Sequence, residues 1–184
     1  MGEPKRLSRK FDVPRKIWDR QKIIADRKLI KEYGLRNKEE IWKAETQVRN
    51  LRKQARQLLA GRVDDYNKRS KEIINKLVKM GVFTKDHTVE DILKLQATDV
   101  LERRLQTQVF KKGLSLSVSQ ARQLITHGHI AVNGVKRTAP SSIVFVGDSI
   151  SYTDTKIKAV IEKSLESKGK PVLKEQKKEE VKGE

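Results

Sequence analysis

The sequence contains no cysteine, and this absence excludes disulfides, thiolate metal ligands and cysteine nucleophiles. It also lacks long apolar segments: the longest unbroken run, residues 143–146, is far short of the roughly 20 residues that a membrane-spanning helix needs. The charged N-terminus has no apolar signal-peptide segment. Aromatic residues make up only 5% of the 184 residues. We therefore expect a soluble, intracellular protein with a modest core, built as one domain or two small ones.

Motifs that identify common enzyme classes are absent as well. The chain has no GxxxxGK[ST] phosphate loop, no GxGxxG fingerprint and no GxSxG nucleophile turn. His127 and His129 are the pair that invites a metal interpretation, but no cysteine and no obvious acidic third ligand accompany them. We predict no catalytic residue, no cofactor and no metal site.

Positive charge is what the chain has in excess. Lys and Arg number 42 against 24 Asp and Glu, which gives a formal net charge of +18, and residues 1–72 carry +11 of it. Such a field attracts polyanions, because each phosphate that a Lys or Arg neutralises releases counterions. Solubility alone and an anionic membrane are the alternatives, and we find no helix with one wholly apolar and one wholly basic face. The charge favours RNA.

The first half of the chain has the pattern of helices. Pro14 suits the first turn of a helix that runs towards Tyr33, and Gly34 is placed to end it. Trp18 lies in the apolar stripe of this helix and Trp42 in that of the next. We therefore expect both indoles to pack in the core, although stacking on bases is the alternative.

The second predicted helix has an apolar stripe and a basic face. Asn37 and Glu40 form a capping box at its start, and Gly61 ends it. Its apolar positions recur at helical spacing: Ile41, Val48, Leu51, Ala55 and Leu58. Between them lie the basic residues Lys43, Arg49, Arg52, Lys53 and Arg56. This face is either an RNA contact or merely solvated.

A third helix is predicted to start after Asp64 or Asp65 and to stop at Gly81, and Thr88 with Asp91 marks the start of a further short helix. We place the start of a second module near residue 88. The predicted parts are a basic N-terminal arm over 1–13, a helical body over 14–87, a module with a short terminal helix over 88–165, and a charged, disordered tail over 166–184.

The second module mixes helices with short strands. One helix is predicted over residues 98–113, and Ser117 or Ser119 caps another that ends at Gly128. Residues 129–132 alternate like a strand and lead into Asn133-Gly134, a dipeptide that type I′ hairpin turns favour. Two further strands are predicted over 143–146 and 149–153, with Asp148 serving the turn between them. The fold class is therefore α+β: a helical N-terminal body plus two helices packed on a small, mainly antiparallel sheet.

Two stretches carry a resemblance to a known family. LERRLQTQVFKKGLSLSVSQARQLITHGHIAVNG, residues 101–134, resembles the ribosomal S-four RNA-binding module, and EYGLRNKEEIW, residues 32–42, is similar to small-subunit ribosomal proteins of the S-four family in its archaeal and eukaryotic branch. The resemblance implies a primary binder of small-subunit ribosomal RNA at a helical junction, which supports assembly and borders the region where messenger RNA enters. It also implies a place in the cytoplasmic ribosome beside neighbouring ribosomal proteins.

The resemblance also implies an RNA-facing surface. Carried over position by position, this surface falls on Arg103, Arg104, Lys111, Lys112, Ser119, Arg122, His127, His129 and Asn133, to which we add Lys136 and Arg137. Arginine can hold a phosphate with two hydrogen bonds, so we rank the three arginines of the helices, Arg103, Arg104 and Arg122, first. We expect Arg103→Ala with Arg104→Ala to weaken RNA binding and to leave the fold intact. Some bacterial relatives have a cysteine zinc site, which this chain cannot form.

Two other classes of function remain as alternatives. Modules of this type also occur on RNA-modifying and tRNA-charging enzymes, but the rest of this chain is short, helical and basic. A transient ribosome assembly factor is the second, and stable association only with precursor particles would favour it.

Overall fold

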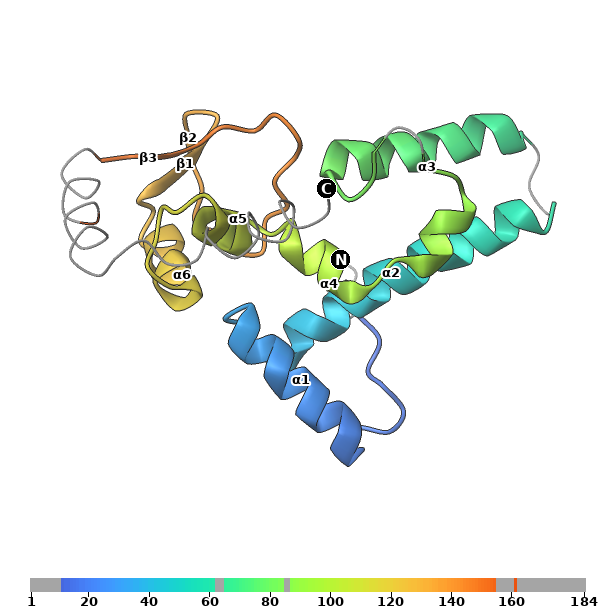
Figure 1. The fold of residues 1–184 in the computed structure, drawn as a ribbon, viewed down its shortest axis with the longest axis horizontal. Helices are drawn as coiled ribbons and strands as arrows, with labels where there is room; N and C mark the ends of the chain where they lie inside the picture. Colours follow the sequence, from blue (N-terminus) through green and yellow to red (C-terminus); the bar gives the residue numbers. More distant parts are fainter. Residues whose placement is uncertain (1–10, 62–64, 85–86, 155–160, 162–184) are drawn as a thin grey trace, which may run out of the picture. The chain divides into compact units, whose positions relative to one another are not determined.

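A computed structural model describes residues 11–61, 65–84, 87–154 and Ile161 of the chain (Figure 1). The chain forms two compact units, residues 1–102 and 103–184. We call them the helical unit and the module. No helix in the described ranges combines the length and the apolar character that crossing a membrane requires.

The helical unit is organised around one long helix. This helix, α2 (Lys38–Leu59), contacts α1 (Arg20–Glu32) near its start, as well as α3 (Tyr66–Met80) (Figure 1). Its predicted apolar stripe is confirmed, because four of the five positions are buried and the fifth, Leu51, packs against the core. The helix ends at Leu59 with Ala60 as its C-cap, just before the predicted Gly61. A single helix therefore supplies one side of the core and leaves its other face to solvent.

The start of α1 differs from the prediction. The helix begins at Arg20 and not near Pro14, because Asp19 is the N-cap and its carboxylate accepts a hydrogen bond from the backbone N–H of Gln21 at 3.1 Å. Trp18 consequently lies outside the helix with 88% of its surface exposed, so the predicted core packing of this residue is wrong. A carboxylate that accepts a hydrogen bond from a backbone N–H of the first turn fixes the helix start, whereas a proline is only compatible with that turn.

The other helix ends of this unit follow the predicted signals more closely. The N-cap of α2 is the predicted Asn37, and the Glu40 carboxylate accepts from the backbone N–H of Arg36 at 3.3 Å. Asp65 is the N-cap of α3, and Gly81 is its C-cap.

A short 3₁₀-helix and a short α-helix complete the helical unit. These are η1 (Glu90–Lys94) and α4 (Ala97–Glu102), and both pack against α2. The Asp91 carboxylate accepts from the N–H and the hydroxyl of Thr88 at 3.0 and 3.2 Å, which confirms the predicted helix start. The bond from the backbone of Thr88, and then the one from Lys94, lower the pKa of Asp91 below its ordinary value. The division between the units lies after Glu102, later than the boundary expected near residue 88.

The single helix predicted over residues 98–113 is wrong. The chain forms α4 and then α5 (Leu105–Lys111), separated by Arg103 and by an extended Arg104 at φ −69° and ψ 145°. Here the backbone pairs with residues 142–144: the N–H of Leu105 donates to Ser142 at 2.7 Å, and the N–H of Val144 donates to Arg103 at 3.0 Å. This pairing with a distant segment overrides a helical pattern that runs unbroken in the sequence.

Within its described residues, the module packs the helices α5 and α6 (Val118–Thr126) and a three-stranded sheet around one core. The strands are β1 (Ile130–Val132), β2 (Val135–Lys136) and β3 (Ile150–Tyr152) in the order β2-β1-β3. Both strand pairs are antiparallel. The core combines buried residues of α5, α6 and β1 with Val144 and Ile161. This architecture confirms the predicted α+β fold class.

The hairpin between β1 and β2 has the predicted turn. Asn133 and Gly134 both have positive φ, 52° and 77°, as type I′ geometry requires. The strand predicted over 143–146 is wrong, because Ile143 makes only an isolated bridge to Arg104. The tail over 166–184 and most of the predicted terminal helix lie outside the described residues.

Candidate nucleic-acid interface

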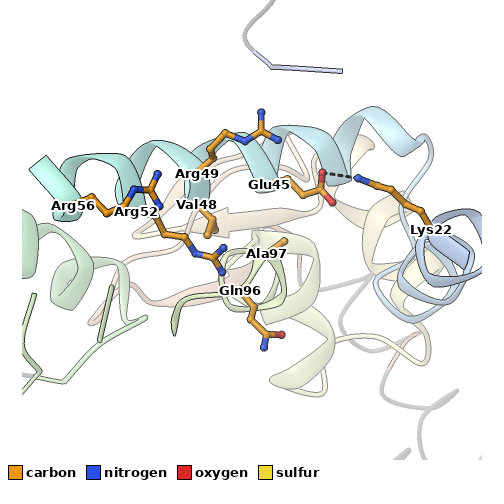
Figure 2. Close-up of a pocket in the computed structure, with 8 residues that line it drawn as sticks. All are labelled: Lys22, Glu45, Val48, Arg49, Arg52, Arg56, Gln96 and Ala97. Carbon is orange, nitrogen blue, oxygen red and sulfur yellow. Dashed lines mark hydrogen bonds and ion pairs between the residues drawn. The ribbon is translucent and has the colours of Figure 1, made fainter. Parts of the chain in front are cut away.

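The helical unit contains an open groove with basic walls. Its volume is about 460 Å³, and Figure 2 shows the side chains that line it. They are Lys22 of α1, Glu45, Val48, Arg49, Arg52 and Arg56 of α2, and Gln96 and Ala97 at the start of α4. The three arginines are spaced three and four residues apart, so one face of α2 presents them together. Four cations and one carboxylate make this groove strongly attractive to anions.

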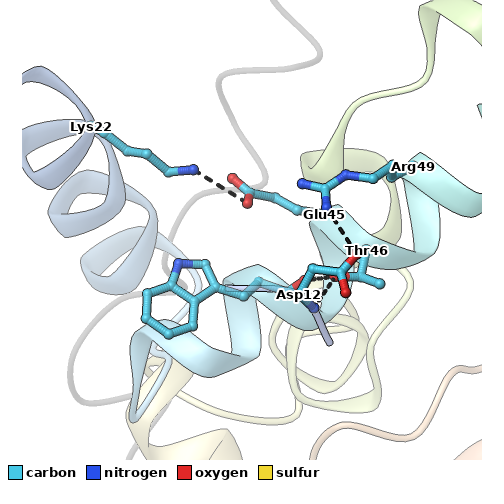
Figure 3. Close-up of polar contacts among 6 residues, drawn as sticks. Asp12, Lys22, Glu45, Thr46 and Arg49 are labelled. Atoms are coloured by element: carbon cyan, nitrogen blue, oxygen red, sulfur yellow. Dashed lines mark hydrogen bonds and ion pairs between the residues drawn. The ribbon is translucent and has the colours of Figure 1, made fainter. Parts of the chain in front are cut away.

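One arginine of the groove is held by an ion pair on the surface. Nη1 of Arg49 lies 2.9 Å from the Asp12 carboxylate, and the side chains of the two residues are 53% and 64% exposed. The backbone N–H of Asp12 also donates to the Thr46 hydroxyl at 3.1 Å, so this part of the predicted N-terminal arm lies on α2 (Figure 3). An exposed pair of this kind is worth only about 0.2–1 kcal/mol, so a phosphate can displace the carboxylate.

The remaining cations of α2 differ in how they are engaged. A guanidinium N–H of Arg52 donates to the carbonyl oxygen of Leu95, which ties α2 to the segment before α4. This bond orients Arg52 and leaves its positive charge uncompensated. Lys53 and Arg56 are exposed and make no hydrogen bond or ion pair within the described part of the chain. Lys22 and Glu45, by contrast, form a pair at 3.5 Å across the groove (Figure 2).

The groove is suited to binding a phosphate backbone. Arginine side chains on one helix face can contact successive phosphates, and their guanidinium groups can each form two parallel hydrogen bonds. A-form RNA is recognised mainly through phosphates, 2′-hydroxyls and shape, and these contacts need no deep cavity. Three of the five residues of the predicted basic face, Arg49, Arg52 and Arg56, line this groove, whereas Lys43 and Lys53 do not.

In the module, the predicted lysines of α5 lie on the surface. Lys111 and Lys112 at its C-terminal end are both exposed, and Nζ of Lys112 donates to the carbonyl oxygen of Asp148 at 3.3 Å. On α6, Ser119 is exposed, while the N-cap is Ser117, whose hydroxyl accepts from the N–H of Gln120 at 3.2 Å. Both lysines therefore place their positive charges on the surface near the end of α5.

The three arginines that we ranked first as RNA contacts are partly or fully buried in the module. Arg104 is only 6% exposed, and a guanidinium N–H of Arg103 donates to the carbonyl oxygen of Val144 at 3.1 Å. Arg122 is partly buried, and Nη1 donates to the side-chain oxygen of Gln106 at 3.3 Å. Since truncating Arg103 and Arg104 removes internal contacts, we no longer expect that double substitution to leave the fold intact.

Asn133 joins the hairpin to the turn before β3. Its side-chain N–H donates to the Asp148 carboxylate at 2.7 Å, and its side-chain oxygen accepts from the N–H of Ser149 at 2.9 Å. Asp148 also accepts from the N–H of Phe145 at 2.8 Å, which confirms that it serves the turn. The hydrogen bond from Asn133 and then that from Phe145 lower the pKa of the Asp148 carboxyl. The amide of Asn133 therefore has a structural role beyond the turn geometry that the sequence indicated.

Histidine and lysine side chains gather at the end of α6. The rings of His127 and His129 are stacked with centroids 6.0 Å apart, and Nδ1 of His129 lies 3.7 Å from the Asp154 carboxylate. A Cβ placed on Gly128 would lie 2.0 Å from Cε of Lys136, so a larger residue here would displace the end of this lysine side chain. Arg137, which follows it, is exposed. Within the described ranges, no group of three or more metal-binding side chains is assembled.

Four groove residues were not singled out from the sequence: Lys22, Glu45, Gln96 and Ala97. Lys22 follows the N-cap Asp19 by three residues, so a correct reading of the cap would have placed it in the first turn of α1. Gln96 lies in a connection whose position depends on how η1 and α4 pack on α2. No local signal identifies such a residue.

Two family models together match most of the chain. The model described as ribosomal protein S4/S9 N-terminal domain matches residues 1–102, and the model described as S4 domain matches residues 103–150. The border between the two matches coincides with the division between the helical unit and the module.

Related proteins give a consistent result. The chain is 50% identical over 149 residues to the small ribosomal subunit protein uS4 of Saccharolobus solfataricus, with 80% of this chain and 82% of the relative covered. It is 49% identical over 158 residues to the uS4 protein of Sulfolobus acidocaldarius, with coverages of 84% and 90%. For the uS4 protein of Methanococcus maripaludis the identity is 44% over 155 residues, with coverages of 83% and 87%. The chain therefore belongs to the S4 family of small-subunit ribosomal proteins.

Proposed function

We propose that the chain is a structural, non-enzymatic constituent of the small ribosomal subunit that binds small-subunit ribosomal RNA. Family membership over both units supports this function. The observation that carries it is the groove of the helical unit, where four basic side chains line one open cavity. Folded RNA offers matching phosphates, and the formal net charge of +18 draws it to the surface.

We further propose that the two units bind together at a helical junction of this RNA. The groove face of α2, with Arg49, Arg52, Lys53 and Arg56, would contact one RNA segment. In the module, Lys111, Lys112, Ser119, Lys136 and Arg137 are the residues whose exposure supports direct contact. Arg103, Arg104, Arg122 and Asn133 would act mainly by shaping the module, because each takes part in contacts within the chain. The two histidines at the end of α6, His127 and His129, would face RNA at the edge of this surface.

The wider role follows from the same proposal. A protein that holds a junction in its folded form supports subunit assembly, and we place this one beside neighbouring ribosomal proteins in the cytoplasmic ribosome, near the region where messenger RNA enters. We propose no membrane partner and no cofactor.

Binding to small-subunit ribosomal RNA, compared with a scrambled RNA of equal length over a range of salt concentrations, tests the proposed function. Charge alone predicts that both affinities are similar and fall equally with salt. We expect a preference for the ribosomal RNA that persists at high salt, since shape recognition does not depend on counterion release. Equal affinities would contradict specific binding, and association only with precursor particles would favour an assembly factor.

A further inference from the structure

Trp18 is an exposed aromatic residue that the fold does not use. It is 88% exposed, whereas Trp42, the other tryptophan of the chain, is half-buried beside Phe11 with ring centroids 6.1 Å apart. A tryptophan buries more apolar surface than any other side chain when it is packed. An indole left almost entirely in water by its own fold is therefore a candidate contact for a partner.

The start of α1 offers Trp18 a place to pack that it leaves unused. Trp18 precedes the N-cap Asp19, and the residue before an N-cap often packs against the fourth residue of the helix, here Ile23. Such a contact would cover part of the indole, yet the ring remains exposed and Ile23 is only half-buried. The capping bond from Gln21 to Asp19 forms without it.

The surroundings of Trp18 are basic. Three exposed cations lie within two or three positions of it, Arg15, Lys16 and Arg20, and Asp19 is the only carboxylate between residues 13 and 25. Asp19 is engaged as the N-cap of α1. The nearest groove residue, Lys22, follows in the first turn of the same helix. An aromatic ring flanked by cations and followed by a basic groove suits an anionic chain that carries flat rings.

We propose that Trp18 is a stacking site for an unpaired base of the bound RNA, a role that rests on the proposed function. The indole would stack on the face of one base while the flanking cations contact the phosphates on either side of it. Every base has such a face, so the site discriminates single-stranded from paired RNA more than it discriminates sequence. A base inside a duplex is already stacked on its neighbours and does not reach the ring. Purines, which stack more strongly than pyrimidines, are the preferred bases.

The two tryptophans allow a direct optical test. In Trp42→Phe only Trp18 emits, and in Trp18→Phe only Trp42 emits. We would titrate each variant with oligoadenylate, with an abasic strand of equal length and with a fully paired duplex, and follow binding independently by anisotropy of a labelled strand. Stacking quenches indole emission, so Trp18 should be quenched by oligoadenylate and not by the other two. Trp42 emission should not change with any of them.

Affinity measurements in the protein that retains Trp42 provide a second test, which does not depend on the folding of Trp42→Phe. Trp18→Ala should weaken the binding of oligoadenylate about tenfold, whereas Trp18→Phe should keep most of it because a ring remains. Trp18→Leu is the matched control, since it keeps an apolar side chain without a flat ring. It should bind as weakly as the alanine variant, and binding of the abasic strand should be equal for all four proteins.

The outcomes separate this inference from the proposed function. If oligoadenylate binds with unchanged Trp18 emission, or if Trp18→Leu binds it as well as the parent protein does, stacking is wrong and RNA binding stands. If quenching occurs only when other small-subunit proteins are added, the partner of Trp18 is a protein and the inference is also overturned. If the parent protein fails to prefer small-subunit ribosomal RNA, the proposed function itself fails, whatever the oligonucleotides show.

Discussion

In the helical unit, Lys53 and Arg56 extend from α2 into solvent, and Arg49 is held only by an exposed pair with Asp12. In the module, Arg104 is 6% exposed and Arg103 donates to a backbone carbonyl, although sequence reasoning ranked both first. The comparison shows that a basic residue on the exposed face of a long helix and a basic residue between two structural elements differ in their contacts. The first keeps its charge exposed to solvent, whereas the second makes contacts within the fold.

The physical reason lies in the neighbours that each position acquires. Along α2 the buried positions recur every three or four residues on one face, and basic residues occupy positions between them, so the sequence itself displays which side chains are exposed. At Arg103 and Arg104 the helix opens and the backbone pairs with residues 142–144. That segment lies far along the chain, and it brings carbonyl groups that an arginine can bond.

The largest expected effect concerns the core of the module. Ile125 on α6 is fully buried, so Ile125→Ala should lower the free energy of unfolding by about 2–5 kcal/mol. The matched control is Gln123→Ala at an exposed position of the same helix, which should change it by less than about 0.5 kcal/mol. Denaturant titration measures both. Equal losses of unfolding free energy in the two variants would mean that α6 turns a different face to the core. The described burial in the module would then be wrong.

A smaller loss of stability is expected at Asn133. Asn133→Ala removes the side-chain bonds to Asp148 and Ser149 and places alanine at φ 52°, so unfolding should become easier by about 1–3 kcal/mol. Asn133→Gly removes the same bonds, but glycine adopts positive φ without strain, so this variant should lose less unfolding free energy than Asn133→Ala. RNA affinity of the folded protein should be unchanged in both. Weaker RNA binding at full stability would instead assign Asn133 a direct contact, as the family resemblance implies.

In the helical unit, removing a carboxylate should strengthen binding. Asp12→Asn removes the carboxylate that pairs with Arg49 at the groove. Affinity for small-subunit ribosomal RNA should therefore rise about two- to threefold at moderate salt. Glu39→Gln makes the same change of charge at an exposed position of α2 that does not line the groove. A filter-binding or anisotropy titration of the two variants separates a local effect from net charge. Equal gains would show that the groove has no special role.

The smallest effect is a pH dependence in the module. Hydrogen bonds from Asn133 and Phe145 hold the pKa of Asp148 below its ordinary 3.8, so the ionised carboxylate stabilises the folded state above that pH. This contribution is lost as the pH falls from 3.8 through the lowered value. The difference in unfolding free energy between the parent protein and Asp148→Asn should therefore be constant near neutral pH and shrink in acid. A difference that grows in acid would contradict the assignment.

Local signals predicted much of the fold because each depends on nearby residues only. Glycines at the ends of α3 and α6, the type I′ dipeptide Asn133-Gly134 and the apolar stripe of α2 all performed as expected. The prediction of where α1 starts was wrong, although the signal that decides it is also local. We predicted this start from Pro14 alone, and it was the capping bond from the N–H of Gln21 to Asp19 that placed the first residue of the helix at Arg20.

The remaining errors involve contacts between distant residues. The pattern of Leu101, Leu105 and Val109 is one continuous helical stripe, and nothing in it indicates a break. In the structure Leu101 packs in the helical unit, whereas Leu105 and Val109 pack in the module. One continuous apolar stripe in the sequence can therefore supply residues to two separate cores. The basic groove was found only in part for the same reason, because its Gln96 wall depends on tertiary packing.

The central claim is that the groove arginines bind RNA while the arginines at the start of the module support its fold. The measurement that tests it compares Arg49→Ala/Arg56→Ala with Arg103→Ala/Arg104→Ala, each for affinity to small-subunit ribosomal RNA and for unfolding free energy. The groove pair should lose about tenfold or more in affinity, with a shallower salt dependence and unchanged stability. The module pair should lose about 1–3 kcal/mol of stability and less affinity when folded. A fully stable module pair with the larger loss of affinity would contradict the account.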